Sequence, residues 1–315
     1  MKITVLDAET LGKDLCLDPL NEVGEVTIYN YSTPNEVVER IADTDVVIIN
    51  KIKLNETNLC FAKNLKLICI AATGYDNVDT RYCKEHNIAV CNVVGYSTNS
   101  VALLTVSLAL SLVTHLREYN EYVTSGEYTK RGIPNRLEPT FHELEGMTWG
   151  IVGLGNIGKK VAKIAEAFGC KVIANKRTAE EGYDIVDVDE LIERSDIISI
   201  HTPLNDSSRG LISKERIEKM KKGAIVVNVA RGAVCDEKAL AEAAKKGDIS
   251  IGVDVYSTEP FSADHPFYEI KDQKNVLFTP HNAWGAYEAR NRCLMEMIEN
   301  IKAFYAGKVR CRVDI

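Results

Sequence analysis

The sequence has no long hydrophobic run, no paired cysteine motif and no low-complexity tract. Its longest apolar stretch, Val101 to Val113, spans 13 residues, whereas a membrane-spanning helix needs roughly 18 or more. The nine cysteines are scattered singly, with no CxxC pair and no Cys/His cluster at metal-ligand spacing. The first residues, KITVLDAE, lack the basic segment and apolar core of a signal peptide. We therefore expect reduced thiols, a cytoplasmic location, no membrane partner and no metal site.

The charge balance also excludes a class of partner. Lys and Arg number 38 and Asp and Glu 45, which gives a net charge of −7. Because an acidic protein repels phosphate backbones, we expect no nucleic-acid partner. With 315 residues, 45% of them hydrophobic and 26% charged, the chain has the composition of an ordinary globular protein of about two domains.

Short β-branched runs alternate with amphipathic segments in two parts of the chain. The first ninety residues contain five such runs, and a second alternation of six begins at Thr148. This pattern predicts an α/β protein with two doubly wound parallel sheets, the second module beginning near residue 100. A last helix is expected at Tyr287 to Tyr305, ending at Gly307.

The middle of the chain connects the two modules. A long apolar helix from Ser97 to about Arg117 is followed by a polar segment with Gly and Pro, Tyr119 to Glu145, that has no clear period. We expect this connector to pack on a partner subunit and the protein to be a homodimer.

A GxGxxG turn opens the second alternation. After the strand WGIV come Gly153, Gly155 and Gly158, and then a helix. In that context the first glycine turns the chain, the second lets a pyrophosphate approach the backbone, and the third lets helix and strand pack closely. The pattern predicts dinucleotide binding at a helix N-terminus. The alternative is that the glycines only make a tight connection.

The residues that follow the second strand of this module bear on the choice of nucleotide. NAD-binding folds usually carry an acid there, which bonds the adenosine ribose. The segment KVIANKRT instead has Lys176, Arg177 and Thr178, which would bond a 2′-phosphate. This favours NADP(H), with NAD(H) possible if the two cations are only a solvated turn.

Three polar residues follow apolar strands: Arg231 after AIVVNVA, Glu259 after GVDVYST, and His281 in LFTPHNAW. Doubly wound sheets collect their chemistry at strand ends. An arginine can clamp a carboxylate, a histidine can donate a proton, and a neighbouring carboxylate keeps that histidine protonated. Together the three suit reduction of a 2-keto acid, although each alone would more often be structural or exposed.

Other candidates are weaker. His201 also ends a strand, where we favour a cofactor-lining backbone over catalysis. There is no GxSxG elbow and no cysteine with an orienting histidine. Surface or packing roles are expected for the remaining histidines, His86, His115, His142 and His265.

Long motifs make the chain resemble the D-isomer-specific 2-hydroxyacid dehydrogenase family. They are TGYDNVD (73 to 79), GLGNIG (153 to 158), IHTPLNDSSRGLI (200 to 212), MKKGAIVVNVARGAVCDEKAL (220 to 240), GVDVYSTEP (252 to 260) and NVLFTPHNAW (275 to 284). The resemblance implies a flavodoxin-like substrate domain, 1–97 plus 287–315, and a Rossmann dinucleotide-binding domain, 98–286.

The resemblance also implies roles for matched positions. Arg231, Glu259 and His281 match the family's catalytic triplet, and Thr73 and Gly74, with Arg231, the substrate site. Cofactor contacts are implied for Gly153, Gly155, Asn156, Ile157, Gly158, Thr202, Val229, Ala230, Asp254 and Trp284. Lys176 departs from NAD-using members, which carry an acid there.

The segments ELEGMTWGIVGLGNIG and PHNAWGAYEAR are most similar to the glycerate dehydrogenase or hydroxypyruvate reductase branch. We therefore expect a dehydrogenase that reduces hydroxypyruvate or glyoxylate to the D-2-hydroxy acid with NAD(P)H. The alternatives are another keto acid, such as pyruvate or a branched one, and a corepressor-like protein that senses dinucleotide with little turnover.

Overall fold

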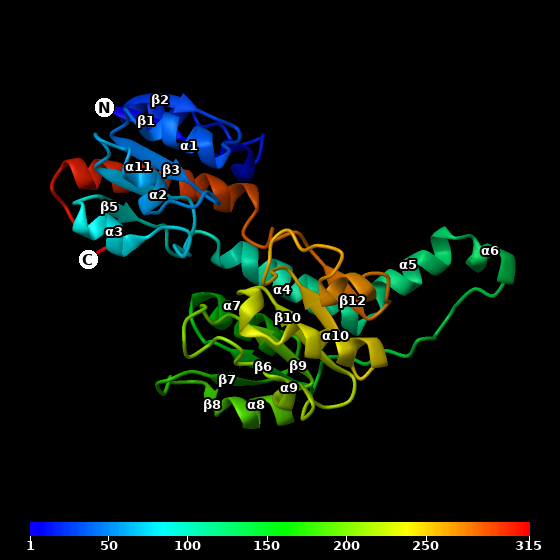
Figure 1. Cartoon of the computed structure of the whole chain (residues 1–315). Coiled ribbons are helices and arrows are strands. Elements are labelled where there is room, and N and C mark those ends of the chain that lie inside the picture. The colour runs from blue at the N-terminus through cyan, green and yellow to red at the C-terminus, as the bar shows by residue number, and fades with distance from the viewer. The chain divides into compact units, whose positions relative to one another are not determined.

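The computed structural model describes all 315 residues, which form two compact units (Figure 1). Unit 1 combines Met1–Ser97 with Gly285–Ile315, and unit 2 comprises Thr98–Trp284. Each unit is built on one parallel sheet with helices packed on it. The predicted α/β class with two parallel-sheet domains is therefore confirmed.

Unit 1 has a five-stranded sheet in the order β2-β1-β3-β4-β5, the flavodoxin-like order. Its strands are β1 Lys2–Val5, β2 Glu25–Ile28, β3 Val46–Ile49, β4 Leu67–Ile70 and β5 Ala89–Cys91. Its helices are α1 Pro34–Ile41, α2 Glu56–Leu59, α3 Thr80–Glu85 and α11 Tyr287–Tyr305, with short 3-10 turns at Ala8–Leu11 and Asp18–Glu22. Every residue of β3 and β4 is buried, as expected for central parallel strands covered on both faces.

The C-terminal part of the chain completes unit 1. Helix α11 packs on β4 and buries Leu294 and Ile298 completely. Beyond it, Arg312 forms an antiparallel bridge with Cys91, and the Asp314 carboxylate accepts the Val90 N–H at 2.7 Å. The last residues therefore cover the β5 edge of the sheet, which would otherwise expose unpaired backbone groups.

Unit 2 has a seven-stranded parallel sheet in the order β12-β11-β10-β9-β6-β7-β8. The strands are β6 Thr148–Val152, β7 Lys171–Asn175, β8 Asp184–Ile185, β9 Ile197–Ile200, β10 Ala224–Asn228, β11 Ile249–Val253 and β12 Val276–Phe278. The order reverses between β6 and β9, as in dinucleotide-binding sheets. The sequence pattern predicted six of these strands and missed β8, because two residues are too few to show an alternation.

The helices of unit 2 cover both faces of its sheet (Figure 1). They are α4 Thr98–Val113, α5 Leu116–Thr124, α6 Glu127–Arg131, α7 Asn156–Ala167, α8 Val188–Arg194, α9 Lys214–Ile217 and α10 Glu237–Lys246, with 3-10 turns at Gly232–Val234 and Pro266–Ile270. Helix α4 packs on α7, β10 and β11. No single helix has the length and apolar composition to cross a membrane. Helices α4 and α5 reach that length and composition only when counted together, and the pair is bent by 65°.

Helices α5 and α6 form an arm that extends away from the sheet of unit 2 (Figure 1). Neither helix contains a buried residue. The arm and the segment that returns from it instead expose large apolar side chains, among them Val123 at 54%, Leu137 at 76% and Phe141 at 50%. The arm therefore has no core of its own.

Candidate active site

The predicted site residues of unit 2 follow five neighbouring strands. Gly153 follows β6, Thr202 follows β9, Arg231 follows β10, Glu259 comes after β11, and His281 comes after β12. These strands are parallel and adjacent in the sheet, so their carboxyl ends lie along one edge. Such an edge, at the point where strand order reverses, is where open α/β sheets bind ligands.

The glycine turn is shaped by close approaches. Gly153 has φ +96°, and a Cβ there would lie 2.7 Å from the Thr202 nitrogen; a Cβ on Gly158 would lie 2.4 Å from the Gly153 oxygen. Apart from Gly155 and its two chain neighbours, no atom lies within 4 Å of the place where Gly155 would carry a Cβ. Helix α7 begins at Asn156 without a side-chain cap, so its first N–H groups suit an anion. The turn thus fits a dinucleotide pyrophosphate.

His281 and Glu259 form a hydrogen-bonded pair. His281 Nδ1 lies 2.6 Å from Glu259 Oε2, and the two side chains are 21% and 32% exposed. The other carboxylate oxygen, Oε1, accepts the Tyr256 N–H at 2.9 Å. Since Nδ1 is engaged by the carboxylate, Nε2 is the ring atom that can serve a substrate. The pair has the composition of a general acid and the carboxylate that orients it.

Asp254 holds the turn that carries His281. Its Oδ1 accepts the Thr279 hydroxyl at 2.6 Å and the Asn282 N–H at 2.9 Å, and its Oδ2 accepts the Ala283 N–H at 2.9 Å. Burial raises the pKa of Asp254, against the three hydrogen bonds that favour its charged form. His281 itself has φ +53°, a left-handed backbone that bulky residues rarely adopt. The buried acid thus anchors the turn in which His281 has this unusual conformation.

The Arg231 backbone is fixed by Asn228 at the end of β10. The Asn228 side chain accepts the Ala230 N–H and donates to the Arg231 oxygen, both at 3.0 Å. The half-buried guanidinium donates to the Ala230 oxygen at 2.8 Å. The next residue, Gly232, is buried, and a Cβ there would lie 2.1 Å from the Tyr256 carbonyl carbon. The arginine turn thus packs directly on the loop that leads to Glu259.

A buried pair that the sequence did not reveal supports the same loop. Glu237 Oε2 lies 3.1 Å from His265 Nε2, and the side chains are 9% and 8% exposed. Glu237 Oε1 accepts the Ser257 N–H at 2.9 Å. Because His265 Nδ1 accepts the Phe267 N–H, its proton lies on Nε2 and points at the carboxylate. His265, expected to be a surface or packing residue, is a buried partner of the loop that carries Glu259.

Lys176 follows β7, as predicted, but an acid is present beside it. Its ammonium forms an ion pair with Glu180, four residues later, and the other Glu180 oxygen pairs with Lys159. Arg177 and Thr178 are exposed, and Arg177 donates to the Ser207 hydroxyl at 3.3 Å. The cluster therefore has two ammonium groups around one carboxylate, at the strand end where dinucleotide-binding sheets generally meet the adenosine ribose.

Other predicted contacts of unit 2 lie at the same strand ends. Val229 is buried and Ala230 half-buried, and Trp284 Nε1 donates to the His281 oxygen at 3.0 Å. The Nε2 atom of His201 lies 3.0 Å from the Ser199 hydroxyl oxygen, and its Nδ1 atom is buried with no hydrogen-bond partner. Burial lowers the pKa of His201 to about 3, so the ring is neutral at working pH.

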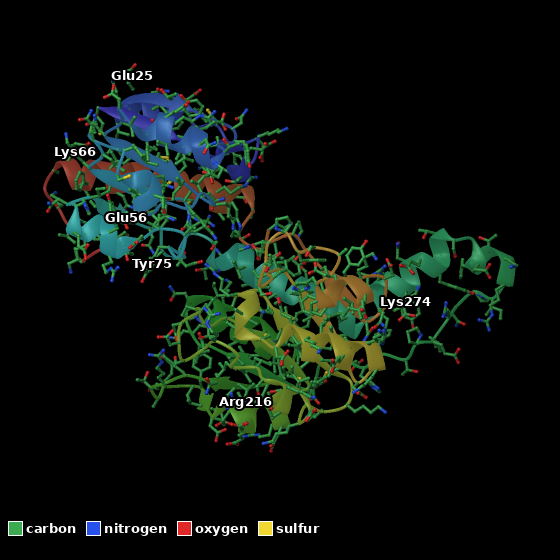
Figure 2. All side chains as sticks on the ribbon, in the orientation of Figure 1. Glu25, Glu56, Lys66, Tyr75, Arg216 and Lys274 are labelled. Atoms are coloured by element: carbon green, nitrogen blue, oxygen red, sulfur yellow. The ribbon has the colours of Figure 1, made fainter.

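Thr73 and Gly74 belong to unit 1, in the loop after β4. The Thr73 hydroxyl donates to the Val93 oxygen, and its own carbonyl accepts the Asn92 amide, both at 2.7 Å. Tyr75, labelled in Figure 2, follows them at the surface of unit 1. The loop is thus anchored at Thr73.

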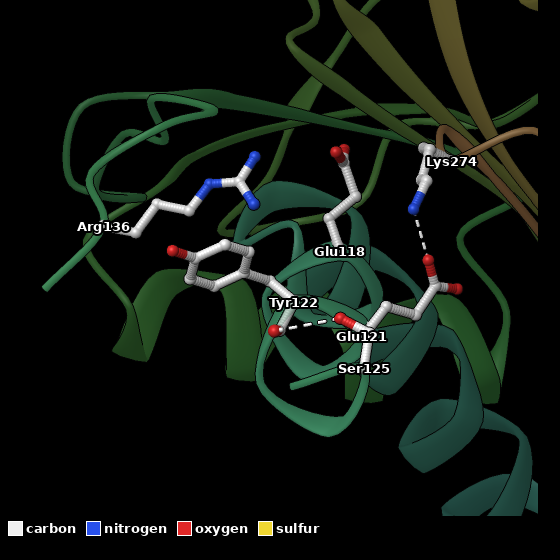
Figure 3. A pocket seen from close by; sticks show the side chains of 6 residues that line it. All are labelled: Glu118, Glu121, Tyr122, Ser125, Arg136 and Lys274. Carbon is white, nitrogen blue, oxygen red and sulfur yellow. Dashed lines mark hydrogen bonds and ion pairs between the residues drawn. The ribbon is translucent and has the colours of Figure 1, made fainter. Parts of the chain in front are cut away.

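A hollow beside α5 contains none of the predicted site residues (Figure 3). Lys274 in its wall pairs with Glu121, and the Arg136 guanidinium lies 4.4 Å from the Tyr122 ring centre. No group of three or more His, Cys, Asp and Glu side chains in the structure is placed to hold a metal ion.

Comparison with known proteins agrees with this geometry. Residues 106–283 match the model of the D-isomer specific 2-hydroxyacid dehydrogenase NAD binding domain. The chain belongs to this family. It is an oxidoreductase that carries the family's dinucleotide-binding domain, which confirms the resemblance noted in the sequence.

Two curated members of the family are similar over nearly the whole chain. A hydroxypyruvate reductase of Blautia hydrogenotrophica is 35% identical, covering 98% of both chains, and a glycerate dehydrogenase of Methylorubrum extorquens is 36% identical, covering 98% of this chain and 97% of that one. Among solved structures, an acyclic imino acid reductase in complex with NADPH and D-Arg has 30% identity and a TM-score of 0.86, covering 99% of this chain and 100% of that one. The branch expected from the sequence is that of the two curated relatives.

Proposed function

We propose that this dehydrogenase reduces a small 2-keto acid, hydroxypyruvate or glyoxylate, to the D-2-hydroxy acid, with NADPH preferred over NADH. The observation that carries the reaction is the 2.6 Å pair of His281 and Glu259, on an edge shared with Arg231 and the glycine turn. The relatives named hydroxypyruvate reductase and glycerate dehydrogenase support the substrate.

Each side chain of the triplet has one role. When bound, the nicotinamide nucleotide supplies a hydride to the carbonyl carbon of the substrate. His281 donates the proton on its Nε2 to the carbonyl oxygen as negative charge develops there. Glu259, on Nδ1, stabilises the protonated ring before that transfer and fixes its orientation. Arg231 binds the substrate carboxylate and polarises the carbonyl.

Lys176, Arg177 and Thr178 support the preference for NADPH, because they offer two cations and a hydroxyl at the ribose end of β7. Replacing Lys176 by Asp should shift the ratio of kcat/KM values toward NADH. An unchanged ratio would mean that the 2′-phosphate is bound elsewhere.

The decisive experiment follows oxidation of NADPH and of NADH by absorbance, with hydroxypyruvate, glyoxylate, pyruvate and a branched 2-keto acid. Fast NADPH oxidation with hydroxypyruvate or glyoxylate is the expected result. Turnover only with pyruvate or the branched acid would contradict the proposed substrate. Silence with every substrate, together with tight dinucleotide binding, would favour a sensing protein instead.

We also propose a homodimer in which the α5–α6 arm packs on a second copy. The arm buries none of its own residues and exposes Val123, and the segment that returns from it exposes Leu137 and Phe141. Light scattering should give twice the chain mass, and Leu137→Glu should give the monomer. Phe61→Glu, which alters an apolar residue of unit 1 that is 52% exposed, should leave the dimer intact. A monomeric mass for the unaltered protein would refute the proposal.

The cytoplasmic location and the lack of nucleic-acid and membrane partners remain predictions from composition.

A further inference from the structure

Three charged residues from separate segments meet at the carboxyl end of β7. Lys159 directly follows Gly158 in the first turns of α7, Lys176 follows β7, and Glu180 lies in the loop between β7 and β8. Each Glu180 oxygen pairs with one ammonium group. The three side chains are 38%, 30% and 24% exposed, so the bridge is accessible from solvent.

The bridge leaves positive charge in excess. Two ammonium groups face a single carboxylate, and together they hold the pKa of Glu180 down to about 2. A phosphate monoester carries about −1.5 to −2 charges and three acceptor oxygens. It therefore matches two ammonium groups better than a carboxylate does.

The position of the bridge relates it to the cofactor. The carboxyl end of the second strand is where a dinucleotide-binding sheet meets the adenosine ribose, and an arginine nearby accommodates the 2′-phosphate in NADP-binding members. Lys176 and Lys159 stand at that strand end and beside the glycine turn. The carboxylate of Glu180 and a 2′-phosphate thus require the same two cations.

We propose that Glu180 sets the cofactor choice of this enzyme by competing with the 2′-phosphate for Lys159 and Lys176. This inference rests on the proposed use of NADPH and names the groups that tune it. Binding of a 2′-phosphate displaces the Glu180 carboxylate from the two lysines. A nucleotide without the 2′-phosphate leaves the bridge closed.

The test measures binding by calorimetry, with adenosine 2′,5′-bisphosphate and AMP as probes and without turnover. Glu180→Gln should tighten the bisphosphate by about tenfold, since it frees two charged donors, and should change AMP binding less than about twofold. The matched control is Glu181→Gln, which removes the same charge from the exposed neighbouring residue and should change neither probe. Lys159→Gln should weaken the bisphosphate and spare AMP.

Equal effects of Glu180→Gln and Glu181→Gln would overturn the proposal, because they would reduce it to a general charge effect. So would an equal gain for AMP, or full bisphosphate affinity in Lys159→Gln. These outcomes are separable from those of the proposed function. An unaltered enzyme that prefers NADH would contradict the NADPH preference, whereas a bisphosphate-specific gain in Glu180→Gln would still support the competition.

Discussion

The carboxylate of Asp254 holds the chain on both sides of His281. It accepts the Thr279 hydroxyl before the histidine and the N–H groups of Asn282 and Ala283 after it. The acid is fully buried, and the histidine between these anchors has a left-handed backbone. Asp254 thus fixes the backbone on both sides of His281, the proposed proton donor.

Asp254→Asn should therefore lower kcat by about ten- to a hundredfold, because an amide cannot accept from all three donors and a small misplacement of a catalytic group is costly. The measurement is kcat at saturating cofactor and keto acid. The matched control is Asp248→Asn, which alters an exposed residue directly before β11, the strand that Asp254 follows. An unchanged kcat in Asp254→Asn would show that the turn keeps its shape without the acid.

Glu259→Gln should make reductive activity fade at a lower pH, because the ring loses the carboxylate that is hydrogen-bonded to its Nδ1. The pH profile of kcat/KM for keto acid reduction measures this shift. Glu269→Gln removes the same charge from an exposed position and should leave the profile in place. Coincident profiles for Glu259→Gln and the unaltered enzyme would contradict the pairing.

Glu237→Gln should destabilise the protein by about 2 kcal/mol, because the amide nitrogen would face the Nε2–H of His265 in a buried site. Urea unfolding measures the change. Glu242→Gln on the same helix is exposed and should cost little. Equal free energies of unfolding for the two variants would show that the buried pair makes no net contribution to stability.

His201 should make stability depend on pH in the acid range. Burial lowers its pKa to about 3 in the folded chain, against about 6.5 when unfolded. Between about pH 6.5 and pH 3 the histidine is protonated in the unfolded chain but not in the folded chain. The free energy of unfolding should therefore fall by about 1.4 kcal/mol for each pH unit below 6.5, down to about pH 3. Above pH 6.5 this residue should contribute no pH dependence.

The readout is the slope of unfolding free energy against pH, compared between His201→Gln and the unaltered protein. In His201→Gln the slope should be shallower by about 1.4 kcal/mol per pH unit, which is the contribution of one proton. His142→Gln, which replaces an exposed histidine, should keep the full slope. Equal slopes in all three proteins would show that His201 takes up a proton without unfolding.

The sequence predicted those features that depend on local pattern. The alternation of strands and helices gave the α/β class, and the glycine turn was found because strand, glycines and helix are contiguous. The family followed from long motifs, and comparison confirmed it. The roles of the individual site residues remain predictions that the variants above test.

Contacts between distant residues were out of reach of such patterns. Glu237 and His265 are 28 positions apart, and nothing local marks them as partners. Glu180 illustrates the same limit at short range. No acid directly follows β7, but the loop after β7 brings the carboxylate of Glu180, four residues after Lys176, to the Lys176 ammonium. Strand β8 is too short to carry a periodic signal.

The division of unit 1 between the two ends of the chain affects how it can be made. Its sheet is encoded in the first ninety-odd residues, but α11 and the strand-edge cover at 311–314 come last. During synthesis the face of the N-terminal sheet that α11 covers therefore stays exposed until residues 287–314 have left the ribosome. Unit 2, which is continuous, can fold first. Residues 1–97 are thus the part of the newly made chain that needs protection from aggregation for longest.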